Sequence, residues 1–189
     1  MFGFIKRWRA QRDALAQEIA DMLEAYTKRW RAMSTEELSA LTDEALLCAV
    51  RARITAFHDA EDDATVLSRL NAEQTVLYVA DTYFGEIGQG GLCQYFVNDG
   101  ALTAPMLSEA LAAIGADAHR ALFDTFVHDH AIDLHTLADF LDDRYPSIDK
   151  CREAMEKRYP LTEFDVAYYK LPQPNAEMVS YVRTHISSF

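Results

Sequence analysis

The chain has 189 residues, half of them hydrophobic, and contains only seven glycines and five prolines. This length suits one domain with a substantial core, and the scarcity of Gly and Pro disfavours the many turns of a β-sandwich or β-barrel. Eighteen Lys and Arg against 30 Asp and Glu give a net charge of −12, which argues against binding to nucleic acid or to an anionic membrane surface.

We therefore predict an all-α fold: a single compact domain of about nine or ten helices that begins with an amphipathic helix. The three cysteines, Cys48, Cys93 and Cys151, are widely spaced and form no Cys-x-x-Cys pair, so we expect reduced thiols that are mostly buried. No apolar run approaches the roughly 20 residues of a membrane span, and the start of the chain lacks a secretory signal. We expect a cytoplasmic protein.

The first 33 residues differ in charge from the rest. Residues 1–31 hold seven basic and four acidic residues, or +3, whereas the remaining 11 basic and 26 acidic residues give −15. Apolar residues recur here at helical spacing, at Trp8, Leu15, Ile19, Met22, Tyr26, Trp30 and Met33. We predict a basic amphipathic helix over residues 1–33 and an acidic all-helical domain over 34–189. The apolar stripe either packs on the same chain or pairs two copies as a short coiled coil, and a membrane-surface role is a third reading.

Capping signals place the next helices. Ser34 followed by Glu37 is a capping box, and Thr42 can cap the helix after it. Asn71 with Gln74 begins a long helix that we expect to end near Gly88. Gly90 and Gly91 then permit a tight turn.

Later helices are placed by Gly and Pro positions. A short helix over 92–98 precedes one opened by Thr103 and Pro105, Gly115 stops that helix, and Asp117 caps the next. The prolines after it separate four further helices, which we place at 134–144, 148–159, 163–170 and 176–186.

The sequence lacks the common catalytic motifs, such as a Gly-x-Ser-x-Gly elbow, a phosphate-binding glycine loop or His-Glu-x-x-His. We therefore predict no enzyme activity, no cofactor and no metal. One alternative is an enzyme that binds a metal or small ligand through a cluster of histidines and aspartates: His119, His128, His130, His135, Asp124, Asp129 and Asp133. His128 and His130 point to different sides of a helix, so we favour exposed imidazoles that gain protons readily.

The clearest feature is an acidic segment. Eight carboxylates lie between residues 117 and 149, all of them Asp, against two arginines. Asp139, Asp142 and Asp143 stand at i, i+3 and i+4, which places them on one face of a helix, and a second trio repeats that spacing. Such a face is either solvated or recognised by a basic partner. The predicted surface comprises Asp59, Asp62, Asp63, Asp117, Asp124, Asp129, Asp133, Asp139, Asp142 and Asp143.

The string from Gly85 to Gly100 resembles the signature of a bacterial family of domains of unknown function that includes a DNA-mimic protein. The likeness extends over roughly residues 36–189, with Gln89 and Leu92 departing from the usual Asn and Phe. The matching positions are Glu86, Gly90, Gly91, Gln94, Tyr95, Phe96 and Asn98. We expect a structural role for them, with Gln94 and Asn98 bonding each other or a loop. The resemblance implies an all-helical fold and occupation of the basic surface of a DNA-binding protein.

Our hypothesis is a non-catalytic acidic module that occupies the DNA-binding groove of a transcription regulator. Its partner would be a basic protein, without direct binding to nucleic acid or membrane, and a homodimer is one reading of the N-terminal stripe. Besides the metal-dependent enzyme, a second alternative is an interaction or immunity-type module that binds through an aromatic surface at Tyr168, Tyr169 and Tyr181.

Overall fold

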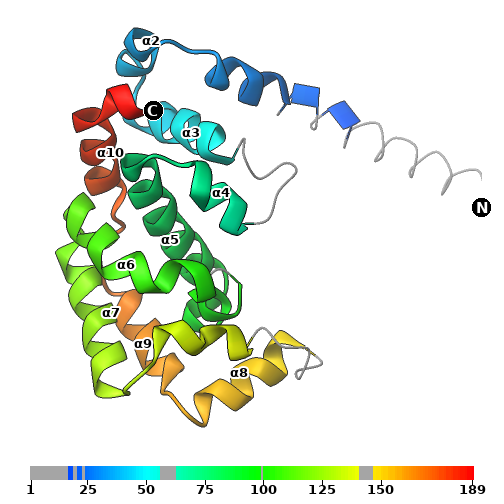
Figure 1. Ribbon diagram of the computed structural model, residues 1–189, viewed down its shortest axis with the longest axis vertical. Coiled ribbons are helices and arrows are strands. Elements are labelled where there is room, and N and C mark those ends of the chain that lie inside the picture. Colours follow the sequence, from blue (N-terminus) through cyan, green and yellow to red (C-terminus); the bar gives the residue numbers. More distant parts are fainter. Residues whose placement is uncertain (1–16, 19–20, 23, 56–62, 99, 141–146) are drawn as a thin grey trace, which may run out of the picture. The chain divides into compact units, whose positions relative to one another are not determined.

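The computed structural model describes residues 17–18, 21–22, 24–55, 63–98, 100–140 and 147–189, without the side chains of 63, 64, 101 and 138–140. Every regular element in these ranges is helical, which confirms the all-α prediction (Figure 1). The chain divides into two compact units, residues 1–56 and 57–189. The predicted division after residue 33 stays a prediction.

In the first unit, helical residues 24–31 are followed by α2 (Thr35–Ser39) and α3 (Asp43–Ile54). The predicted capping box is present, because the Glu37 N–H donates to Ser34 Oγ at 3.2 Å and the Ser34 N–H donates to Glu37 Oε2 at 2.7 Å. Thr42 caps α3 by accepting from the Ala45 N–H at 3.4 Å. Both helix starts were therefore predicted correctly.

Two arginines hold the N-terminal helical segment against α3. Arg53 on α3 donates to the carbonyl oxygens of Trp30, at 3.0 Å, and Met33, while Arg31 donates to Ala52 O at 3.2 Å. Each guanidinium thus binds carbonyl groups near the end of the other helix, where carbonyls lack helical partners. These bonds fix how the two helices cross within this unit.

The N-terminal apolar stripe is only partly described. Its members Trp8, Leu15 and Ile19 lie outside the described residues. Farther along, Met22 is 50% exposed and Tyr26 47% exposed, and the Tyr26 ring packs on that of Trp30 with centroids 5.8 Å apart. The middle of the stripe is therefore open to solvent.

The second unit is built around its longest helix, α5. In chain order it contains α4 (Asp63–Arg69), α5 (Ala72–Val97), α6 (Gly100–Ile114), α7 (Asp117–Asp129), the 3-10 helix η2 (Leu134–Phe140), α8 (Ile148–Glu156), α9 (Leu161–Tyr168), α10 (Asn175–Thr184) and η3 (Ile186–Ser188). Helix α5 contacts α6, α8, α9 and η2, and α6 in turn contacts α7 and α10 (Figure 1). Helix α5 is thus the common partner of α6, α8, α9 and η2.

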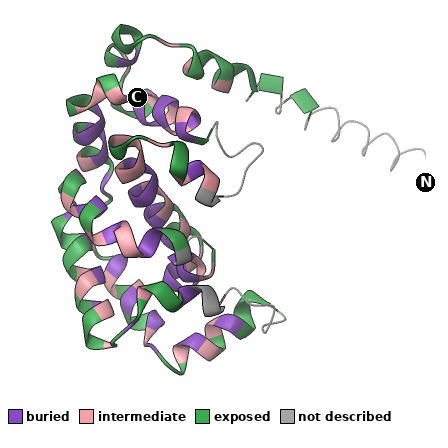
Figure 2. Ribbon diagram, in the orientation of Figure 1, coloured by how far each residue is buried: buried purple, intermediate pink, exposed green. Residues whose placement is uncertain are grey.

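Buried residues run along α5 (Figure 2). Its Tyr83 is the centre of an aromatic core. The fully buried Tyr83 ring makes edge-on contacts with Tyr95, Phe123 and Tyr168, with centroids 5.3 to 5.9 Å apart. These rings come from the second half of α5, from α7 and from α9. Edge-on aromatic pairs favour defined geometry, so this cluster sets how the three helices pack.

The start of α5 is anchored to the C-terminal turn. The capping box predicted at Asn71 and Gln74 is present, with the Gln74 N–H donating to Asn71 Oδ1 at 2.8 Å. Both side-chain amides also donate to Ser188 O, at 2.8 and 2.9 Å. A local helix-start signal therefore also makes a contact with the other end of the unit.

Three helix boundaries were predicted wrongly. Helix α6 begins at Gly100, so Thr103 and Pro105 lie inside its first turns rather than before it. Asp117 is the first helical residue of α7, whose N-cap is Ala116 without a side-chain bond. The segment predicted as one helix over 134–144 is a 3-10 helix that ends, within the described residues, at Phe140. Gly115 does terminate α6, with a φ of 80°.

Across the described part of the chain, no helix combines the length and apolarity that crossing a membrane requires.

Candidate functional site

The signature segment forms a break in α5. Gly90 has φ −149° and ψ 15°, and Gly91 has φ 75° and ψ −175°, so the helix ends at this pair and starts again after it. The turn predicted at these glycines is therefore confirmed. The conformation of Gly91 is one that residues with a side chain rarely adopt.

The carboxylate of Asp165 on α9 caps the restarted helix. Its Oδ1 accepts the Leu92 N–H at 2.8 Å, and a Cβ added to Gly91 would lie 2.2 Å from Oδ2. A helix restart leaves N–H groups without partners, and a carboxylate there is favoured by both hydrogen bonding and the helix dipole. Glycine at 91 is thus required by the backbone and by the approach of Asp165.

Two further side chains secure the break. Arg152 on α8 donates to Gly90 O and lies 3.5 Å from Asp165 Oδ2. Tyr169, directly after α9, donates its hydroxyl to Ile87 O at 2.8 Å. Burial raises the pKa of the Asp165 carboxyl, while the Leu92 N–H and Arg152 oppose that shift.

These partners were only partly foreseeable. Asp165 falls in a string that resembles the family, but nothing in the sequence singles it out, and no sequence signal points to Arg152.

The signature residues have mostly structural roles. Tyr95 and Phe96 are fully buried, and Tyr95 Oη accepts from Thr103 Oγ1 at 2.9 Å. Asn98 donates to Glu86 Oε2 at 2.6 Å, across the break. We expected Gln94 and Asn98 to bond each other or a loop; the side-chain bond of Asn98 goes to Glu86 instead, and the Gln94 side chain lies against Gly90.

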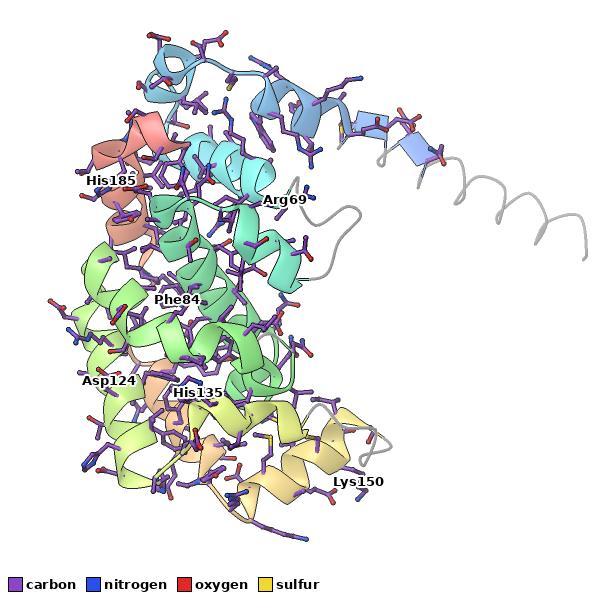
Figure 3. The ribbon with its side chains drawn as sticks, viewed as in Figure 1. Arg69, Phe84, Asp124, His135, Lys150 and His185 are labelled. Atoms are coloured by element: carbon purple, nitrogen blue, oxygen red, sulfur yellow. The ribbon has the colours of Figure 1, made fainter. Side chains whose placement is uncertain are left out.

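The structure describes the side chains of four aspartates of the predicted acidic surface. Asp117, Asp129 and Asp133 are exposed, and Asp124 is partly buried (Figure 3 labels Asp124 on α7 and His135 on η2). Asp124 pairs with Arg120 at 3.4 Å and accepts from Ser108 Oγ at 2.9 Å, while Asp133 Oδ1 accepts the His135 N–H at 3.0 Å. Over residues 117–135, four aspartates against one arginine leave a net charge of −3.

The rest of the predicted surface is largely outside the described residues. Asp59, Asp62, Asp142 and Asp143 lie there entirely. Asp63 begins α4 and Asp139 lies in η2, but their side chains are not described. Since η2 is a 3-10 helix, the α-helical spacing that we assumed for the trio from Asp139 does not apply over the described part of that segment.

The four histidines that lie close together in the sequence have different environments in the structure. His119 is only 3% exposed, with its Nε2 2.9 Å from Pro172 O and its ring 5.0 Å from that of Phe84, so the expectation that it would be exposed is wrong. The His128 side chain is 88% exposed and contacts Asp129 at 3.0 Å, and the His130 ring packs on Phe126. In the described part of the chain, no group of three or more His, Cys, Asp or Glu side chains could hold a metal.

The aromatic surface that we named as an alternative is mostly buried. Tyr168 is 2% exposed and Tyr181 9% exposed, so both belong to the core, and burial raises the pKa of Tyr168 to about 12. Tyr169 is 57% exposed. Of the three tyrosines that we named, one is therefore available to a partner.

Comparison with known proteins gives one match. The model of the family described as DMP19-like protein matches residues 68–185, a narrower range than the 36–189 that we expected. It includes the break at Gly90 and Gly91, Arg152, Asp165 and all of α7. Searches of curated proteins and of solved structures gave no match. Because the matched segment covers more than half of the chain, the protein belongs to the DMP19-like protein family.

Proposed function

We propose that the protein is a non-catalytic acidic module that occupies the basic DNA-binding surface of a transcription regulator and so excludes DNA. The observation that carries this proposal is the exposure of Asp117, Asp129 and Asp133 on α7 and the turn after it, where Arg120 is the one Lys or Arg between positions 117 and 135. The family match agrees with a protein-binding role.

Short, backbone-proximal carboxylates suit this role. Asp loses less rotamer entropy than Glu when it is held by a partner, so an array of Asp presents charge at more fixed positions. The net charge of −15 over residues 32–189 would attract a basic partner at long range. Binding should be fast and should weaken as salt screens these charges.

The direct experiment is capture from a native lysate on immobilised protein, washed at low and at high salt. We expect DNA-binding proteins that elute with salt and that, once purified, are displaced from the protein by duplex DNA. A partner held equally well at high ionic strength, or one that binds DNA and this protein together, would contradict the proposal.

Charge reversal distinguishes binding through this local surface from attraction by the overall charge of the protein. Asp117→Lys with Asp129→Lys should weaken binding of the purified partner by at least about 10-fold, since each rim charge contributes to steering and complementarity. Glu18→Lys with Glu24→Lys is the matched control, because both side chains are exposed and the net charge changes equally. Equal weakening by the two pairs would show that only total charge matters.

A second candidate is binding through an aromatic surface, which the exposure of Val166, at 53%, and Tyr169, at 57%, favours. Reversing Asp139, Asp142 and Asp143 to Lys should abolish binding by a DNA mimic and leave this second mode intact. Tyr169→Phe keeps the ring and Tyr169→Ala removes it; loss of the partner in the Ala variant alone would favour the aromatic surface.

The homodimer is likewise a proposal, supported by the exposed Met22 and Tyr26 on the N-terminal stripe. Light scattering after size exclusion should give twice the chain mass, and Met22→Glu with Tyr26→Glu should give the monomer. A monomeric mass for the unchanged protein would contradict the coiled-coil dimer.

A further inference from the structure

Three sulfur-containing side chains are buried between α5 and α8. Cys93 Sγ on α5 lies 3.7 Å from Met155 Sδ on α8. Cys151 is on α8, four residues before Met155, and burial together with the neighbouring Cys151 thiol raises the pKa of Cys93. Cys93 and Met155 are fully buried and Cys151 is 3% exposed, so water is largely excluded from all three.

The backbone holds these groups in place. Cys151 and Met155 are four residues apart on α8, which puts them on the same face of the helix. Cys93 is the second residue after the break at Gly91, so its position depends on the restart of α5 that Asp165 and Arg152 secure.

We propose that Cys93, Cys151 and Met155 form a binding site for a soft monovalent cation, copper(I). Thiolate and thioether sulfurs are the ligands that select copper(I) over harder metals. Metal–sulfur bonds of about 2.3 Å in a trigonal arrangement require sulfurs about 4 Å apart. The 3.7 Å between Cys93 and Met155 is close to that separation.

Binding is a simple exchange of protons for metal. Two thiols lose two protons, and copper(I) with two thiolates and one thioether leaves a single negative charge; no electron is transferred. Arg152, which comes directly after Cys151 and opposes the rise in the pKa of Cys93, supplies a nearby positive charge.

The test is an anaerobic titration of the full chain with copper(I) buffered by the coloured chelator bicinchoninate. We expect one copper(I) per chain. Cys93→Ser and Cys151→Ser should each weaken binding by at least about 100-fold, because ligands count for more than the outer-shell groups whose loss costs about 10- to 100-fold. Cys48→Ser is the matched control, since Cys48 lies on α3 in the other unit. It should leave binding unchanged.

Met155→Leu keeps the proposal testable if a Ser variant does not fold, because it replaces one apolar side chain by another of similar volume. With unchanged circular dichroism, it should weaken copper(I) binding by about 10-fold or more. The site is overturned if the unchanged protein takes up no copper(I). Equal binding in the Met155→Leu or both Ser variants, or loss in Cys48→Ser, would also overturn it.

Discussion

The carboxylate of Asp165 occupies the space that a side chain on Gly91 would need, with only 2.2 Å between Oδ2 and a Cβ built at that glycine. The two residues are far apart in sequence and belong to different helices. Their contact makes the break in α5 a tertiary feature, since the glycine allows the turn and the aspartate caps the helix that restarts at Leu92.

Gly91→Ala should destabilise the protein. The new Cβ meets Asp165, and the φ of 75° with ψ of −175° falls in a region reserved for glycine, which together should cost about 2 kcal/mol or more. Urea unfolding monitored by circular dichroism measures the change in the free energy of unfolding.

Gly88→Ala is the matched control for that variant. An added Cβ at Gly88 meets nothing within 4 Å, and Gly88 lies in the helical first half of α5. Alanine is favoured over glycine in a helix, so we expect stabilisation by about 0.5–1 kcal/mol. A loss of stability at Gly88 as large as that at Gly91 would show that the break is not the cause.

Asp165→Asn should change how stability depends on pH. Burial raises the folded-state pKa of Asp165 above its unfolded value, so the contribution of this group to stability is present below the unfolded pKa and is lost as pH rises through the folded pKa. The Asn variant lacks this titration. Relative to the unchanged protein, the Asn variant should therefore gain stability as pH rises from about 4.

The measurement is urea unfolding of both proteins from pH 4 to pH 7. A free-energy difference that stays constant over this range would contradict the raised pKa. The loss of the ion pair with Arg152 adds an offset that does not change with pH once the carboxylate is ionised.

Asn71→Ala should lower the free energy of unfolding by more than the loss of an ordinary helix cap does. Its side chain accepts the Gln74 N–H and also donates to Ser188 O, so two bonds are lost where a cap alone loses one. Loss of a cap costs about 1 kcal/mol, and we expect the Asn71 variant to exceed that. Thr42→Ala, which removes a single capping bond to Ala45, is the comparison. Equal effects would show that the Ser188 contact contributes nothing.

Arg53→Met should loosen the N-terminal helical segment within the first unit. The variant keeps an apolar stem but cannot donate to Trp30 O and Met33 O, so both carbonyl groups would lose the bond that Arg53 makes. Hydrogen exchange of the amides of residues 24–33 should accelerate. Amides of α5 in the other unit serve as the internal reference, and faster exchange there as well would indicate general unfolding instead.

Much of the local structure could be predicted from the sequence. The helices that begin at Ser34, Thr42 and Asn71 were predicted from capping residues, because a cap involves groups within three or four positions of one another. The glycine pair predicted the break in α5, since glycine permits backbone conformations that other residues avoid. Composition alone predicted the all-α class.

The contacts between these elements could not be predicted in the same way. No local pattern could show that Asp165 and Arg152 would meet Gly90 and Gly91, that His119 and Tyr168 would be buried, or that Cys93 would face Met155. Contacts of this kind depend on which helices pack side by side. Helix packing depends on the burial of many side chains throughout the unit. A local sequence pattern cannot show which of these side chains will meet.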